Sequence, residues 1–132
     1  MREIKFRAWS NYEQKYYYNI GLINDSIYAD LGDNYGEEEW INIGSVFDDD
    51  YIIEQYTGIK DRRGFDIYEG DIIEVEEKEC QYNEVMTNKY QATVVFREGC
   101  FKLVEENGLM DMIYNKADKC KVIGNIHDKE NK

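Results

Sequence analysis

The segment from Gln55 to Val75 constrains the fold more than any other part of the chain, because it holds two turn signals a few residues apart. The first is Asp61-Arg62-Arg63-Gly64, where the Asp side chain can accept hydrogen bonds from the backbone ahead and Gly can adopt positive φ. The second is Glu69-Gly70-Asp71, and the β-branched run Ile72-Ile73-Glu74-Val75 follows it. The segment therefore predicts a strand, a turn, a very short strand, a second turn and a third strand. We expect it to form a folding nucleus and not a catalytic loop.

Alternating apolar and polar residues predict further strands towards both ends of the sequence. Ile4–Trp9 has a period of two, and the polar turn after it predicts that Lys15–Ile20 returns as the second strand of a hairpin. Ala92–Phe96 alternates in the same way. Lys121–Ile126 is typical of a closing strand, and Gly124 within it marks a bulge or a close backbone approach.

Two stretches in the second half of the chain predict other structure. Glu76–Glu84 is polar and predicts a long hairpin connection. Leu109, Met112 and Ile113 have helical spacing and predict a short helix within Gly108–Lys116.

Length and composition favour one folded domain. The chain has 132 residues, of which 42% are hydrophobic and 14% aromatic, which is sufficient for a buried core. We predict a single mainly β domain over residues 1–132, in which a small bent antiparallel sheet closes into an SH3-like barrel with one short helix. Residues 21–54 are expected to be an acidic insertion into this domain.

Three motifs resemble the signatures of the YopX family: Ile4-Lys5-Phe6-Arg7-Ala8-Trp9, the Gln55–Asp71 stretch and Val122-Ile123-Gly124-Asn125-Ile126. They occur in the family's order and touch both ends and the middle of the chain. The resemblance implies a small protein of phages or prophages of low-GC Gram-positive bacteria, with the same barrel type of fold. The family carries no established activity, so the resemblance assigns no catalytic residue.

The charge of the chain is concentrated in one quarter of its length. The net charge is −12, from 16 basic and 28 acidic side chains. Residues 21–54 contain ten acidic residues and no Lys or Arg, a local charge of −10. A surface of this sign repels nucleic-acid phosphates and anionic membranes and attracts basic partners. The segment is either a solvated insertion whose acids discourage edge-to-edge strand pairing or an acidic docking surface.

The docking interpretation places the partner contacts in two acidic runs. Their residues are Glu37, Glu38, Glu39, Asp48, Asp49 and Asp50. One version is an interaction module that binds a basic protein. In one form of this hypothesis the module is itself a homo-oligomer. The other is a decoy that imitates the phosphate backbone of DNA. Calcium binding by Asp48–Glu54 is disfavoured, because the alternating oxygen-ligand loop with its central Gly is missing.

Nucleic-acid binding by a small β-barrel is the alternative function. Single-strand binders combine basic and aromatic side chains, and the candidate residues here are Lys5, Arg7, Trp9, Lys60 and Arg62. The overall charge of −12 counts against this hypothesis.

The sequence predicts no catalytic, metal or cofactor site. His127 is the only histidine, and none of the three serines lies in a nucleophile elbow. Asp71 follows Gly70 and is expected to cap its turn instead of acting as a general acid or base. We therefore expect a protein that is not an enzyme and holds no cofactor.

Cysteine usage and hydropathy predict the compartment. The cysteines are three widely spaced residues, Cys80, Cys100 and Cys120. This pattern indicates neither a disulfide framework nor a metal site. With no signal-peptide pattern and no apolar stretch of membrane-spanning length, we expect a cytoplasmic protein without a membrane partner.

Overall fold

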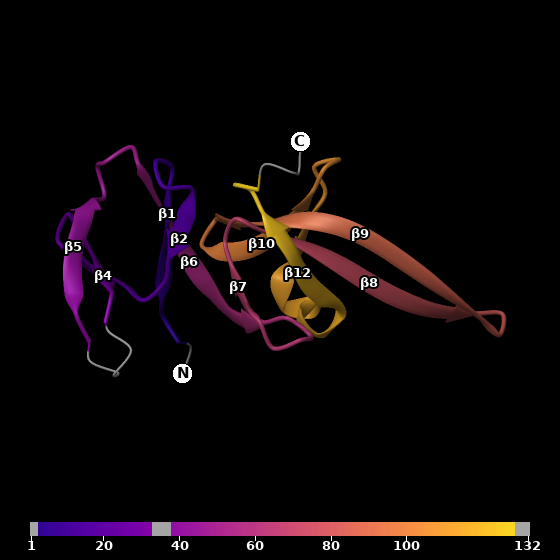
Figure 1. The fold of residues 1–132 in the computed structure, drawn as a ribbon. Helices are drawn as coiled ribbons and strands as arrows, with labels where there is room; N and C mark the ends of the chain where they lie inside the picture. The colour runs from indigo at the N-terminus through magenta and orange to yellow at the C-terminus, as the bar shows by residue number, and fades with distance from the viewer. Residues whose placement is uncertain (1–2, 33–37, 129–132) are drawn as a thin grey trace. The chain divides into compact units, whose positions relative to one another are not determined.

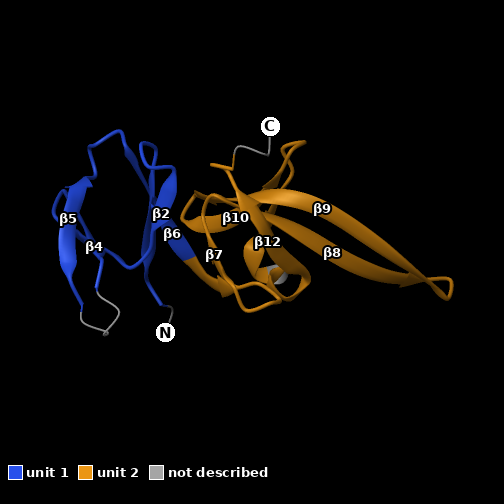
Figure 2. Cartoon of the chain, in the orientation of Figure 1, with its two compact units in different colours: residues 1–56 blue, residues 57–132 orange. Residues whose placement is uncertain are grey.

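The structure is a computed structural model that describes residues 3–32 and 38–128 and is built almost entirely of β-strands (Figure 1). The predicted mainly β class is confirmed, in the form of a curled half-barrel sheet. The chain divides into two compact units, unit 1 over Met1–Tyr56 and unit 2 over Thr57–Lys132 (Figure 2). Buried apolar side chains form two separate clusters, one in each unit.

Unit 1 contains two groups of antiparallel strands. In the first, β1 (Phe6–Ser10) pairs with β2 (Lys15–Tyr17) and with the N-terminal part of β6 (Tyr51–Lys60). The second is a three-stranded sheet in the order β3-β4-β5. Its strands are β3 (Ile20–Ile23), β4 (Ser26–Asp30) and β5 (Trp40–Ser45).

The core of unit 1 is small and draws on the acidic segment. Ala8 of β1 is fully buried together with Ile27 and Ala29 of β4, and Ile20 completes the cluster. Residues 21–54 therefore do not lie outside the fold as a solvated insertion, because they supply β4 and two of these four buried side chains.

Unit 2 contains one five-stranded antiparallel sheet in the order β11-β10-β9-β8-β12. Its strands are β8 (Asp71–Gln81), β9 (Glu84–Arg97), β10 (Cys100–Glu105), β11 (Met110–Met112) and β12 (Cys120–Asn125). The sheet buries a larger core than that of unit 1, with Phe101, Ile73, Val94 and Leu103 almost completely hidden from solvent. Short 3-10 helices, η1 (Ile113–Asn115) and η2 (Ala117–Lys119), lead into β12.

The doubly reversed segment has the predicted structure. The end of β6 leads through a turn into the short strand β7 (Asp66–Tyr68), and a second turn leads into β8. Asp61 organises the first turn, since its Oδ1 accepts hydrogen bonds from the backbone N–H groups of Arg63 and Phe65, both at 2.9 Å. Asp71 caps the second turn, where its Oδ2 accepts a hydrogen bond from the N–H of Tyr68 at 2.8 Å. The structural interpretation of Asp71 is confirmed.

Two predictions for the second half of the chain are wrong. The stretch predicted as a long polar connection, Glu76–Glu84, is strand on both sides of a tight Tyr82-Asn83 turn. The short helix predicted within Gly108–Lys116 is replaced by β11 and η1. Backbone pairing decides both cases: β8 continues because β9 pairs with it to the turn, and β11 pairs with β10. Of the two features expected at Gly124, a bulge or a close backbone approach, the bulge is observed as a shift in the register between Val122 and Gly124 where β12 pairs with β8.

Candidate interaction surface

The β3-β4-β5 sheet of unit 1 has one face turned to the core and one turned to solvent. The register places Ile20 opposite Ala29 on the core face, and Gly21 opposite Tyr28 on the other. Trp40 lies opposite Asp30, so it shares the outer face with Gly21 and Tyr28. The outer face of the sheet that carries most of the acidic segment therefore bears two aromatic side chains.

Gly21 leaves room for the indole ring of Trp40 on this face. A Cβ atom added to Gly21 would lie 3.5 Å from Cζ3 of Trp40, so the indole ring extends across β4 and covers Gly21. The ring remains 48% exposed. Its Nε1 donates a hydrogen bond to Oε2 of Glu38 at 3.4 Å. An exposed tryptophan thus lies directly beside an exposed carboxylate.

The acidic residues predicted as a docking surface form two groups and not one. Glu38 and Glu39 precede β5, Asp48 and Asp49 follow it, and all four are exposed. Glu37 lies outside the described residues. Because β5 has six residues, its ends are about 20 Å apart at the usual rise of a strand. A partner segment of only a few residues therefore cannot contact both groups at once.

The group after β5 has a structural role in unit 1. Oδ2 of Asp50 accepts a hydrogen bond from Oγ of Ser10 at 2.9 Å, and its Oδ1 accepts one from the N–H of Tyr12. Asp48 caps the same loop, since its Oδ1 accepts a hydrogen bond from the N–H of Asp50 at 2.9 Å. These contacts hold the loop before β6 against the β1–β2 turn. The group before β5, next to Trp40, is consequently the stronger candidate for binding.

Of the three candidates for nucleic-acid contact in unit 1, Arg7 and Trp9 are buried. Arg7 and Glu54 are 4% and 2% exposed, and Nε of Arg7 lies 2.8 Å from Oε1 of Glu54. Trp9 is also buried, and its Nε1 donates to Oδ1 of Asn11 at 3.1 Å. Lys5 forms an ion pair with the Glu3 carboxylate at 3.0 Å. This strand therefore offers neither Arg7 nor Trp9 to a nucleic acid.

The basic candidates in unit 2 also have acidic neighbours. Nζ of Lys60 lies 2.8 Å from Oδ1 of Asp66. Arg62 pairs with Glu76 at 3.7 Å. Both cations are partly exposed, but each is next to a carboxylate that lowers its attraction for phosphate.

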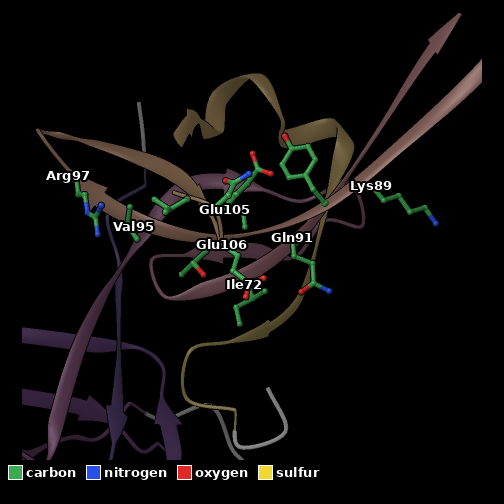
Figure 3. A pocket seen from close by; sticks show the side chains of 12 residues that line it. Ile72, Lys89, Gln91, Val95, Arg97, Glu105 and Glu106 are labelled. Atoms are coloured by element: carbon green, nitrogen blue, oxygen red, sulfur yellow. The ribbon is translucent and has the colours of Figure 1, made fainter. Parts of the chain in front are cut away.

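Unit 2 has an open groove of about 1110 Å³ along β9 (Figure 3). The register brings Ile72, Thr93 and Val104 side by side on the sheet face opposite the core, and Ile72 and Val104 contribute apolar surface to the lining of the groove. The polar rim carries both signs of charge, with Arg97 and Glu106 among its labelled side chains in Figure 3. The groove therefore shows no preference for a ligand of one charge.

The buried thiol of Cys120 is not activated as a nucleophile. Burial raises the pKa of the Cys120 thiol to about 11, and its Sγ lies 3.5 Å from the carbonyl oxygen of Ala117. A thiol with this pKa is protonated at neutral pH and is a poor nucleophile. Among the described residues, no group of three or more His, Cys, Asp or Glu side chains is arranged to hold a metal ion. Within the same part of the chain, no helix is long and apolar enough to cross a membrane.

Comparison with known proteins agrees with the three sequence motifs. Residues 5–131 match the family described as YopX protein. The chain belongs to the YopX family. The fold of this YopX family member is similar to the crystal structure of protein EF1440 from Enterococcus faecalis, with a TM-score of 0.64 and 27% identity, over 98% of this chain and 97% of that one. No curated protein matches the sequence.

The sequence did not single out Trp40 and Gly21 of the YopX fold as parts of a surface. Trp40 is the first residue of the short strand β5. A tryptophan that directly follows a run of three glutamates, in a segment without Lys or Arg, was the available signal. Gly21 carried no signal, because its role depends on the register of β3 against β4.

Proposed function

We propose that this YopX family member is a non-enzymatic interaction protein that binds a basic protein segment through the outer face of the β3-β4-β5 sheet. The exposed indole of Trp40 beside the Glu38 carboxylate is the observation that carries the proposal. The family resemblance adds a phage or prophage setting in the host cytoplasm, and it adds no activity.

Charge supports a basic partner. Residues 21–54 contain no Lys or Arg that would neutralise their ten acids within the segment. Glu38 and Glu39 are exposed, and so is the edge of Trp40 next to them. A Lys or Arg side chain approaching this corner gains attraction from the carboxylates before any contact forms.

The aromatic side chains support a partner that is a protein. The faces of Trp and Tyr rings attract Arg and Lys cations, with a gain of about 0.5–1 kcal/mol at exposed sites. Trp40 and Tyr28 lie on the same sheet face, and Gly21 leaves room for the indole to lie against the sheet. Aromatic residues are also enriched at the centres of protein interfaces.

A DNA-mimic decoy is the second version of this function. It would present carboxylates in place of phosphates to a host DNA-binding protein, and would depend on charge more than on the indole. The two acidic groups at the ends of β5, about 20 Å apart, suit such spacing better than one compact contact. Trp40→Ala separates the versions, because a decoy keeps most of its affinity and a cation–aromatic contact does not.

Nucleic-acid binding has less support. Arg7 and Trp9 are buried, and Lys5, Lys60 and Arg62 each lie next to a carboxylate. Gel-shift titration with single- and double-stranded probes at several salt concentrations tests this alternative. A shift at low salt that weakens steeply with added salt would favour it over the acidic interaction surface.

The proposed function predicts that a synthetic Arg-rich peptide binds at low salt and quenches or shifts the fluorescence of Trp40. Glu38→Lys together with Glu39→Lys should weaken binding about tenfold or more, because attraction is replaced by repulsion at the contact. Peptide titration followed by tryptophan emission measures this, and buried Trp9 contributes a constant background.

The matched control is Glu105→Lys together with Glu106→Lys in unit 2, which changes the net charge by the same amount. It should leave the affinity nearly unchanged. Equal weakening by both double variants would mean that only net charge matters, and would contradict a defined surface at Trp40. An Arg-rich peptide that does not bind at low salt would remove the proposal.

A further inference from the structure

The hairpin of β8 and β9 extends beyond the strands that flank it (Figure 1). β12 pairs with β8 only from Asp71 to Val75, and β10 pairs with β9 only from Ala92 to Arg97. Residues 76–91, here called the hairpin arm, are therefore a two-stranded ribbon to which no other described strand is paired. Both edges of the arm present unpaired backbone groups.

The arm exposes apolar side chains that a lone ribbon cannot bury. Val85 is 67% exposed and Met86 is 58% exposed. Tyr82 at the turn is almost fully exposed. Isolated two-stranded hairpins are marginally stable in water, and a third or fourth strand supplies what they lack. The arm is thus a segment whose order would increase if another strand were added to it.

The hydrogen-bonding pattern shows which groups of β9 are available. The two-residue turn Tyr82-Asn83 has positive φ at both positions, 52° and 66°, as a type I′ hairpin turn requires. Such a turn makes Gln81 and Glu84 a hydrogen-bonded pair, and the pattern then alternates along the ladder. The N–H and C=O groups of Val85, Thr87 and Lys89 consequently point away from β8, towards the open edge.

The open edge of β8 is unsuited to pairing with its own copy. A two-fold axis between antiparallel edge strands runs perpendicular to the sheet, so each residue stays on its own face and meets a residue of the same face. In the two longest such registers, Glu77 lies opposite Glu79 or Glu79 lies opposite Glu79. Like charges directly opposite each other destabilise a strand pair.

The open edge of β9 has no such conflict. One of its longest two-fold registers puts Thr87 opposite Thr87 and Val85 opposite Lys89. The other puts Asn88 opposite Asn88 and Met86 opposite Tyr90. Neither places two acids or two bases together, and Thr–Thr and apolar–aromatic pairs stabilise antiparallel sheets. The charges therefore disfavour self-pairing through the β8 edge and permit it through the β9 edge.

We propose that two copies of this chain associate through the arm, with the 84–91 edge of one β9 pairing antiparallel with the same edge of the other. The pairing turns two exposed ribbons into one four-stranded ribbon. It buries less area than the roughly 1,200–2,000 Å² of a standard interface, so we expect a dissociation constant in the micromolar range. This dimer does not depend on the function proposed for the Trp40 face.

Sedimentation equilibrium of the full chain over about a hundredfold range of concentration tests the dimer. The expected result is a mass that rises from the 15.7 kDa of one chain towards twice that value. Thr87→Pro removes an outward N–H from the β9 edge without removing a bond to β8, and should shift the equilibrium to monomer. Lys78→Pro is the matched control, because Lys78 lies directly opposite Thr87 and its N–H points outward from the other edge. That variant should still dimerise.

A crosslinking experiment is independent of any effect of proline on folding. In a background with Cys80→Ser and Cys100→Ser, Thr87→Cys or Asn88→Cys should form a disulfide-linked dimer on mild oxidation, since residues opposite each other in a strand pair have Cα atoms within disulfide reach. Glu79→Cys on the β8 edge should not. A monomer at every concentration, a dimer that survives Thr87→Pro, or absence of crosslinking at both positions 87 and 88 would each overturn the proposal.

Discussion

The two units differ in what lies at their centres. Unit 2 buries nine residues around Phe101, Ile73 and Leu103. Unit 1 buries a cluster of four, of which two are alanines, and it also buries the Arg7–Glu54 ion pair. The larger apolar core gives unit 2 more of the area-dependent stabilisation that drives folding. Unit 1 depends more on buried polar groups, each of which needs its hydrogen-bond or ion-pair partner.

The net charge also differs between the two units. Unit 1 has twelve acidic and four basic residues, a net charge of −8, and unit 2 has sixteen acidic and twelve basic residues, a net charge of −4. Self-repulsion therefore opposes the compact state more in the smaller-cored unit. The charged surface of unit 1 therefore comes at a cost in stability, and we expect the two units to respond differently to mutation, salt and pH.

The largest expected effect is in the core of unit 2. Phe101 is fully buried, and its ring packs edge-to-face on Phe96 with centroids 4.9 Å apart. Phe101→Ala should lower the free energy of unfolding by about 4 kcal/mol, through lost burial and the cavity left behind. Urea denaturation measures this. Phe47→Ala in unit 1, at a side chain that is 78% exposed, is the control and should change stability by less than about 0.5 kcal/mol. Similar losses from both would contradict the assignment of the main core to unit 2.

The next effect tests the buried ion pair of unit 1. Arg7→Met leaves the buried Glu54 carboxylate without the Arg7 cation and should cost about 3 kcal/mol. Combining it with Glu54→Leu should recover part of that loss, because no charge from the pair remains buried. A double-mutant cycle by urea denaturation gives the coupling. Losses that simply add would show that Arg7 and Glu54 act independently.

A smaller effect concerns pH and unit 2. Burial raises the pKa of Asp61, but backbone N–H donors from Val122, Phe65 and Arg63, together with the Arg63 charge, outweigh it and lower this pKa below 3.8. The folded-state pKa lies below the unfolded one, so the carboxylate stabilises the fold above the unfolded value, and this stabilisation is lost as pH falls through the folded value.

Asp61→Asn should therefore cost about 2 kcal/mol at pH 7, and its stability should fall less steeply than that of the wild type between about pH 5 and 2. Thermal unfolding at a series of pH values measures both. Asp49→Asn, at an exposed carboxylate, is the control and should change stability by less than about 0.5 kcal/mol at pH 7. Parallel pH profiles for the wild type and Asp61→Asn would remove Asp61 from this role.

The β architecture was predictable where a local signal and the tertiary contacts agree. The turn at Asp61–Gly64 was predicted from side-chain capping and a glycine, and the structure uses both. The stretch Glu76–Glu84 was misread because periodicity reports a buried face, and residues 78–84 are exposed on both faces of the hairpin. Leu109 and Met112 mimic helical spacing, but both are exposed and only their neighbour Ile113 reaches the core.

The candidate surface was predictable in charge and not in geometry. The sequence located the acids correctly in the chain. It did not separate Asp50, which holds a turn, from Glu38, which lies beside Trp40, because that distinction depends on contacts with distant residues such as Ser10. It named Arg7 for nucleic-acid contact, whereas Arg7 donates a hydrogen bond to Glu54, 47 residues further along the chain.

The Asp61 carboxylate also reaches across the sequence, since its Oδ2 accepts a hydrogen bond from the N–H of Val122 at 2.9 Å. Val122 belongs to β12, which covers the edge of β8 from Asp71 to Val75. During synthesis on the ribosome, this edge stays uncovered until β12 has emerged from the exit tunnel. A nascent chain stalled before that point would have the Asp61 turn without its Val122 hydrogen bond and an open strand edge beside it.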